Sequence, residues 1–177
     1  MKFLKRFLAF IIVVVVLAAA GAYLLPREVS VARSIDIDAP PAEVFAHVNS
    51  LQAFAEWSPW GDIDPDMTQS FSGPETGVGN RMEWQSADQR VGSGSQEITE
   101  SVADTRVATA LDFGPMGTAD AAFELEPAGQ GTRVTWGFTS DLGMNPMARY
   151  MGLMMDDWVG GDYERGLENL KAAAEGT

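Results

Sequence analysis

The chain has 177 residues, with 25 acidic against 12 basic side chains, one histidine and no cysteine. Because cysteine is absent, disulfides and thiolate metal sites are excluded. The net charge of −13 disfavours nucleic-acid binding, which depends on Lys and Arg side chains that neutralise phosphates. We therefore expect no nucleic-acid partner.

The N-terminal segment has the composition of a membrane anchor. Three basic residues lie within the first six positions, and an uncharged apolar run of 19 residues follows from Phe7 to Leu25. A helix needs roughly 20 apolar residues to cross a bilayer. We predict a transmembrane helix in residues 1–26 and one domain in residues 27–177, whose length of about 150 residues suits a single core.

A cleavable secretory signal is the alternative for this segment, since small residues follow the basic start and the apolar run. Signal peptides have apolar stretches of roughly 7–15 residues, so the longer run favours an uncleaved helix, and the question of cleavage stays open. Basic flanks remain in the cytoplasm. This rule predicts an anchor in the inner membrane with the domain on the extracytoplasmic, periplasmic side, or a secreted domain after cleavage.

The charge of the domain bears on how it meets the membrane. All 25 acidic residues but only nine of the 12 basic residues lie beyond residue 25, so that part of the chain has a formal charge of 9 − 25 = −16. An anionic membrane surface would repel such a domain. We therefore expect attachment through the N-terminal helix alone.

The domain begins with a strand and two short helices. Apolar and polar residues alternate from Val29 to Ile37, which predicts a half-buried strand. Pro40 and Pro41 end this strand and suit the first turn of a helix. Ser50 is a good N-cap for a second short helix that carries Leu51, Phe54 and Trp57.

Six further strands are predicted, separated by short segments rich in Gly, Pro, Asp and Ser. Because the connections are short, consecutive strands should pair antiparallel in a meander. The predicted ranges are 67–72, 80–86, 91–102, 105–113, 118–126 and 132–140.

The last segment changes to helical periodicity. Apolar residues recur at helical spacing from Met147 to Ala174, with a slip of one residue at Gly160 and Gly161. We predict one long C-terminal helix with an irregularity at this glycine pair. Seven strands and a helix that covers their apolar face make an α+β domain.

Four stretches resemble the START-like (SRPBCC) superfamily, also described as the polyketide cyclase/dehydrase and lipid transport group, and in particular a bacterial membrane-anchored subgroup. They are "RSIDIDAPPAEVF", "WSPW", "GTRVTWGF" and "DYERGLENLK". The resemblance implies a helix-grip fold, in which a seven-stranded antiparallel sheet curves around the C-terminal helix. It also implies an apolar cavity that holds lipids, sterols, hormones or polyketides, and a minority of members are enzymes.

Ten residues on inward-facing positions form the predicted ligand cavity, although soft apolar side chains on facing elements also describe an ordinary filled core. Glu100 would be the polar group of this cavity, and Arg33 is a second charge at an inward position. The ten residues are Met82, Trp84, Glu100, Phe113, Phe123, Trp136 and Phe138 on strands, and Met151, Met154 and Trp158 on the C-terminal helix.

Other chemistry has little support in the sequence. His47 is the only histidine and is expected to be a partly exposed structural residue. The run Asp62, Asp64 and Asp66 begins like a calcium loop but lacks the Gly and Glu that such a loop needs at its sixth and twelfth positions. We expect neither a metal nor a cofactor, and no catalytic residue is predicted.

Three functions therefore stay open. The first is an extracytoplasmic, membrane-anchored module that binds a hydrophobic small molecule or lipid between the sheet and the helix. The second is an enzyme of the cyclase or dehydrase kind that uses Glu100 or Arg33. The third is a protein-interaction module with a filled core, which would bind through the surface around Trp57, Trp60 and the "GPMG" turn.

Overall fold

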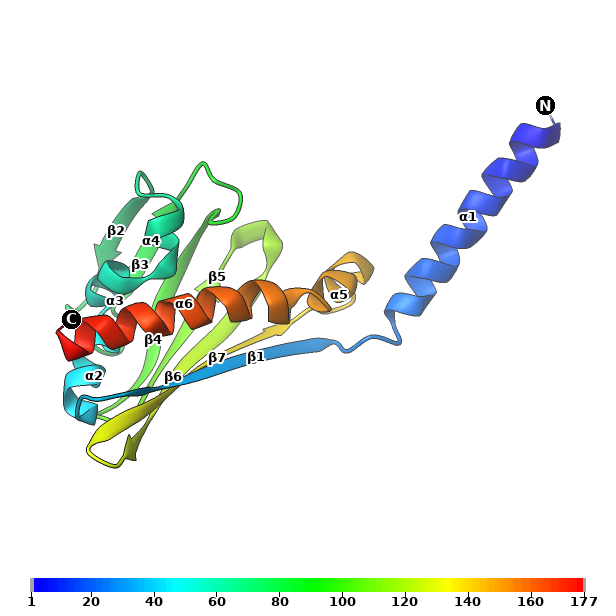
Figure 1. Ribbon diagram of the computed structural model, residues 1–177. Helices are drawn as coiled ribbons and strands as arrows, with labels where there is room; N and C mark the ends of the chain where they lie inside the picture. Colours follow the sequence, from blue (N-terminus) through cyan, green and yellow to red (C-terminus); the bar gives the residue numbers. More distant parts are fainter. Residues whose placement is uncertain (1, 177) are drawn as a thin grey trace.

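A computed structural model describes residues 2–176 of the chain (Figure 1). It has a seven-stranded sheet, a helix that lies across the sheet and a separate N-terminal helix that extends away from the domain. In chain order the elements are α1 (Lys2–Ala22), β1 (Glu28–Ile37), α2 (Pro41–Val48), α3 (Leu51–Trp57), α4 (Pro59–Ile63), β2 (Thr68–Ser72), β3 (Arg81–Gln85), β4 (Ser93–Val102), β5 (Arg106–Asp112), the 3₁₀ turn η1 (Gly114–Met116), β6 (Thr118–Ala128), β7 (Gly131–Asp141), α5 (Pro146–Gly152) and α6 (Met155–Glu175).

The predicted meander is confirmed. The strands lie in the order β1-β7-β6-β5-β4-β3-β2, and every neighbouring pair is antiparallel. The first strand returns to pair with the last, so that Glu28 lies opposite Asp141 and Ile37 opposite Thr132. The expected α+β helix-grip arrangement is therefore present, with the sheet curved around α6 (Figure 1).

The turn from β1 into the short helices follows from local residues. Pro40 is extended, and Pro41 occupies the first turn of α2, where its missing N–H is not needed. The Ser50 side chain accepts a hydrogen bond from the Ala53 backbone N–H and caps α3, as predicted. The segment after α3 differs from the expected loop, because it begins with the single turn α4, which starts at Pro59.

The prediction of one continuous C-terminal helix is wrong in one place. The helix is divided into α5 and α6 at Leu153 and Met154, where the backbone bonds tighten to the spacing of a 3₁₀ turn. The glycine pair lies inside α6 and does not interrupt it. Gly160 instead provides space, because a Cβ atom there would lie 2.1 Å from Nη2 of Arg33.

The N-terminal helix stands apart from the core. Side chains from Phe3 to Ala18 are exposed, and residues Phe3–Ala22 are long and apolar enough to cross a membrane. Burial begins at the last turn of the helix, where Ala22 is fully covered. The apolar surface of α1 is therefore not used for folding the domain.

Candidate ligand site

The half of the sheet next to α2, α3 and α4 is filled by an aromatic cluster. Trp136 of β7 stacks on Tyr163 of α6 at a centroid distance of 3.7 Å and on Phe123 of β6 at 4.8 Å. The edges of Phe54, Trp57 and Trp60 pack around the same indole ring. Burial raises the pKa of Tyr163 well above its ordinary value, so its hydroxyl is neutral. Aromatic rings in mutual contact therefore occupy this half.

The other half lies toward the end of the sheet where α1 joins the domain. Helix α6 packs mainly along β1, so the inward side chains of β3 and β5 are only partly covered there. Trp84 and Phe113 meet edge to face at 5.9 Å, and both are half-buried, as is Leu111. From α6, Met155 and Val159 pack against the same core. These side chains form an apolar surface that the fold leaves incompletely covered.

Gly94 is needed for this surface. A Cβ atom at this position would lie 2.7 Å from the Trp84 ring and 2.6 Å from the Asp112 carbonyl oxygen. The indole ring of Trp84 therefore lies directly over the backbone of the neighbouring strand β4. A side chain at position 94 would force the ring away.

A buried polar pair lies among the apolar residues of the concave face. Nε2 of Gln96 donates a hydrogen bond to Oγ1 of Thr109 at 3.0 Å, and the Thr109 hydroxyl lies 3.5 Å from the Ala121 carbonyl oxygen. Both side chains are about 95% covered, with exposed fractions of 5% and 3%. Neither residue was among the predicted site residues, although the strand alternation that places Ile98 and Leu111 inward also places Gln96 and Thr109 inward.

Glu100, the predicted polar group of the cavity, lies on the outer face of the sheet, and this prediction is wrong. The pairing of β4 with β5 shifts between Ile98 and Glu100, so the alternation changes sides at this bulge. The Glu100 carboxylate accepts a hydrogen bond from Arg106 at 3.0 Å and is half exposed. It has no contact with the concave face.

The other nine predicted residues divide into three groups. Met82, Phe123, Trp136 and Phe138 are buried in the core, and Trp84 and Phe113 lie on the incompletely covered surface. The prediction fails for the helix residues, which are all about half exposed: one lies in α5, one at the break between α5 and α6, and one in α6. These exposed residues are Met151, Met154 and Trp158.

Arg33 is inward-facing, as expected, but it is engaged by the helix. Its guanidinium donates to Glu164 at 2.7 Å and to the Asp156 carboxylate at 3.0 Å, and it lies beneath Gly160. Hydrogen bonds to Asp156 and Glu164 raise the pKa of Arg33 above its ordinary value. The residue thus ties β1 to α6 as a permanently charged group.

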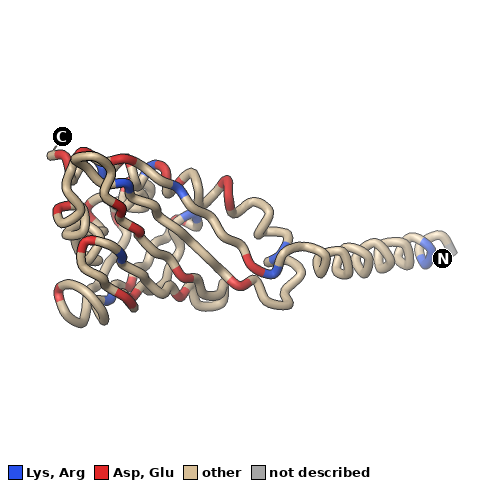
Figure 2. Tube along the Cα trace, turned by 90° about the horizontal axis from the view of Figure 1, so that it is seen from below, with Lys and Arg blue, Asp and Glu red and all other residues tan. Residues whose placement is uncertain are grey.

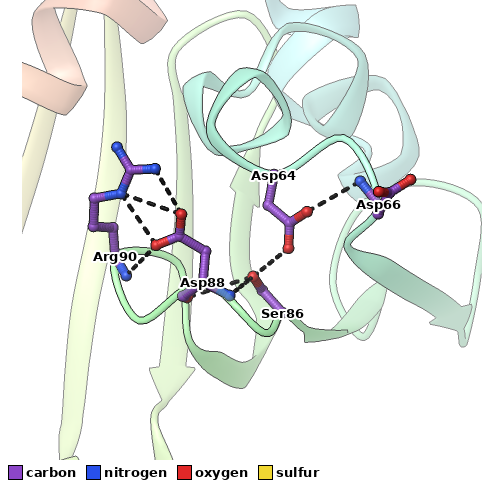
Figure 3. A network of polar contacts seen from close by, with 5 residues as sticks. All are labelled: Asp64, Asp66, Ser86, Asp88 and Arg90. Carbon is purple, nitrogen blue, oxygen red and sulfur yellow. Dashed lines mark hydrogen bonds and ion pairs between the residues drawn. The ribbon is translucent and has the colours of Figure 1, made fainter.

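A polar network holds the loop between β3 and β4 beside this site (Figure 3). The Ser86 hydroxyl donates to Asp64 at the end of α4, and the Asp88 backbone N–H donates to Ser86 at 2.9 Å. Arg90 binds the Asp88 carboxylate at 2.6 Å, and these hydrogen bonds lower the pKa of Asp88 from 3.8 to about 2. The indole N–H of Trp84 donates to the Val91 carbonyl oxygen of the same loop at 3.4 Å.

Two shallow hollows of about 400 and 330 Å³ lie on the outer face of the sheet, opposite α6. They are lined by small and charged side chains such as Ala110, Glu97 and Asp120. Within residues 2–176, no three His, Asp or Glu side chains lie close enough together to hold a metal ion. His47 is half-buried, and its backbone oxygen accepts a hydrogen bond from Trp57.

Comparisons with solved structures support the fold. The protein TTHA0849 from Thermus thermophilus is 17% identical, with a TM-score of 0.62 over 82% of this chain and 96% of that chain. A putative uncharacterized protein from Rhizobium leguminosarum is 16% identical, with a TM-score of 0.61 over 85% and 96%. The Aha1 dimer from Colwellia psychrerythraea is 19% identical, with a TM-score of 0.53 over 83% and 96%. At these identities the likeness shows a shared fold.

A search of curated proteins gave no match. Residues 28–175 match the model of the family described as polyketide cyclase / dehydrase and lipid transport. The match begins at the first residue of β1 and ends at the last residue of α6, so it covers the whole sheet and the helix across it. The chain therefore belongs to the polyketide cyclase/dehydrase and lipid transport family of START-like proteins.

Proposed function

We propose that this protein is a membrane-anchored START-like module that binds a hydrophobic small molecule or lipid on the concave face of its sheet. In this proposal α1 spans the inner membrane, residues 27–177 form the extracytoplasmic domain, and no covalent chemistry takes place. The observation that carries the proposal is the half-buried surface of Trp84, Leu111 and Phe113 beside the buried Gln96–Thr109 pair.

The chemistry of this surface suits a molecule with a long apolar part and a small polar group. Burial of apolar ligand area contributes roughly 25 cal/mol per Å², and Trp84 and Phe113 offer two aromatic faces for it. The Gln96–Thr109 bond uses the amide nitrogen of Gln96. It leaves the amide oxygen to accept a hydrogen bond from a ligand hydroxyl.

Binding would require side chains to move, because the concave face carries a packed core. Met82 lies two residues before Trp84 on β3, and Met155 of α6 packs against the same core. Methionine adapts its shape more readily than branched or aromatic residues do. The aromatic cluster around Trp136 would stay in place. The ligand would therefore occupy the half of the domain that is closer to α1.

The enzyme alternative loses the residues on which it was based. Glu100 is bound to Arg106 on the outer face, and Arg33 is bound to Asp156 and Glu164. A catalytic role for either would need its ion pairs to break. A hydrophobic ligand needs no such change, which is why we favour a binding function.

Photo-crosslinking tests the proposal in the full chain. The protein would be placed in zwitterionic lipid nanodiscs with a diazirine-bearing fatty acid, irradiated and mapped by peptide mass spectrometry. We expect label on residues 81–85 and 106–113 that disappears when unlabelled fatty acid is added in excess. Label on α1 should not saturate, because this helix would meet bulk lipid.

Matched variants define the contribution of the polar pair. The double variant Gln96→Leu/Thr109→Val keeps the shapes of both side chains but removes their polar atoms, and it should lose at least half of the saturable label. Thr135→Val on the outer face should behave like the wild type. Label confined to α1 would exclude the ligand site and favour a filled core with a protein partner, whereas an unlabelled α1 would contradict the membrane anchor.

A further inference from the structure

The segment from Leu142 to Met155, which we call the methionine segment, is unusually apolar for an exposed part of the domain. It holds five of the nine methionines and a single charged residue, Arg149. Arg149 is buried, and its guanidinium donates two hydrogen bonds to the Gly143 carbonyl oxygen. Six of its large apolar side chains are between 40% and 68% exposed: Met144, Met147, Tyr150, Met151, Leu153 and Met154.

This segment is fastened to the last turn of α1 by contacts far apart in the sequence. The Tyr150 hydroxyl donates to the Ala18 carbonyl oxygen at 2.8 Å, and the Tyr23 hydroxyl donates to the Met144 carbonyl oxygen at 3.3 Å. Arg149 donates to the Leu25 carbonyl oxygen at 3.2 Å and lies over the Tyr23 ring. Helix α5 therefore lies beside the end of α1 (Figure 1).

If α1 spans a membrane, the level at which the methionine segment contacts α1 sets how deep its side chains lie in the bilayer. The apolar helix Phe3–Ala22 has 20 residues, which at 1.5 Å per residue is about 30 Å, the thickness of the hydrocarbon core. Ala18 is one turn before Ala22, so the Tyr150 hydroxyl reaches roughly 6 Å back along the helix. Tyr is enriched at this interfacial level, and amphipathic helices bury their apolar faces to about 5–10 Å.

Charge also distinguishes the methionine segment. Figure 2 shows acidic residues spread along the domain, whereas α1 carries no charge after Arg6. No acidic residue occurs between Leu142 and Met155, and the next two residues are Asp156 and Asp157. A contact with lipid would therefore rest on apolar burial, and these two carboxylates would mark where the chain returns to water.

We infer that the methionine segment is a second membrane contact, which lies in the interfacial layer of the same zwitterionic bilayer that α1 crosses. The inference rests on the proposed anchor, because the geometry requires α1 to span the membrane. It differs from the expectation that attachment is through the N-terminal helix alone, because it adds a second contact. It would also hold the half of the sheet with Trp84 and Phe113 close to the bilayer, since their strands end on the same side as α5.

Spin labels can test this inference in the full chain, which has no cysteine of its own. Single cysteines would replace Met151 and Leu153 in the methionine segment, Val14 in the middle of α1, and Gln130 in the exposed turn at the opposite end of the sheet. Each labelled protein would be reconstituted in phosphatidylcholine vesicles. Electron paramagnetic resonance would then compare collisions with oxygen, which concentrates in lipid, and with a nickel chelate, which stays in water.

We expect labels at 151 and 153 to give an oxygen-to-nickel ratio at least threefold above that of the label at 130, and a label at 14 to give the highest ratio. A lipid-like label at 14 together with a water-like label at 151 and 153 would overturn the inference and leave the anchor intact. Labels at 151 and 153 that are shielded from both reagents would mean that a protein surface covers them, which also overturns it. A water-like label at 14 would instead refute the proposed anchor.

Discussion

Replacing Gly166 of α6 by alanine should place a methyl group against the buried indole ring of Trp136. A Cβ atom there would lie 2.7 Å from Cζ3 of Trp136 and 3.1 Å from Cδ of Pro59. Trp136 is 2% exposed and stacked between Tyr163 and Phe123, so its ring has no free space into which to move. The steric cost therefore has to be met by strain in the core.

The change in the free energy of unfolding combines a gain in helix propensity with a cost of overpacking, and the same substitution at Gly161 of α6 isolates the first of these. Alanine stabilises a helix interior by about 1 kcal/mol relative to glycine, whereas overpacking a core costs roughly 1–3 kcal/mol. No atom lies within 4 Å of a Cβ at Gly161, so Gly161→Ala should show only the gain. Gly166→Ala should be less stable than Gly161→Ala by about 1–3 kcal/mol, which lowers Tm by roughly 2–12 °C.

Thermal unfolding of the full chain in one detergent, followed by near-UV circular dichroism, measures this difference. The near-UV signal reports the packing of the tryptophan rings, so it follows the core and not α1. Equal melting temperatures for the two variants, or a higher one for Gly166→Ala, would refute the tight packing that we infer between α6 and Trp136.

Three further results are expected. Thr109→Val alone leaves the buried Gln96 amide without its partner and should lower the free energy of unfolding by about 1–3 kcal/mol. In urea unfolding, the double variant with Gln96→Leu should recover part of that loss, and additive losses would contradict the pairing. Glu100→Gln should leave fatty-acid labelling of the domain unchanged, because its carboxylate lies on the outer face; reduced labelling would contradict the register shift. The pKa of Asp88 is lowered to about 2, so its ionised form should stabilise the fold fully above about pH 4 and lose that effect as the pH falls toward 2. In an NMR titration, Arg90→Gln should move the titration midpoint of Asp88 up toward 3.8, and an unchanged midpoint would contradict the hydrogen-bonded pair.

Strand positions could be predicted well from the sequence, because alternation and turn residues are local signals. The Val29–Ile37 strand, the proline pair and the Ser50 cap all appear in the structure as expected. The face of the sheet on which a residue lies after a bulge could not be predicted, because the register shift between Ile98 and Glu100 depends on hydrogen bonds between two strands. One extra residue in the pairing moved Glu100 to the opposite face.

The helix residues illustrate a different limit. The spacing of Met151, Met154 and Trp158 correctly shows a shared helical pattern, but periodicity does not say what that face will meet. All three are about half exposed, and the helix that was expected to carry them is divided between Met151 and Trp158. In our account the bilayer beside α1, and not a cavity, explains the apolar character of Met151 and Met154, whereas Trp158 lies beyond Asp156 and Asp157 and outside the methionine segment.

The central claim, that the domain holds a hydrophobic ligand, is tested most directly by native mass spectrometry of the full chain isolated from its membranes and moved into a volatile detergent buffer. The wild type and the Gln96→Leu/Thr109→Val variant would be compared, since both carry the same α1 and the same annular lipids. We predict one additional hydrophobic molecule per wild-type chain, identifiable after organic extraction and depleted in the variant. Identical apo masses for both proteins would contradict the account and indicate a domain whose core is filled.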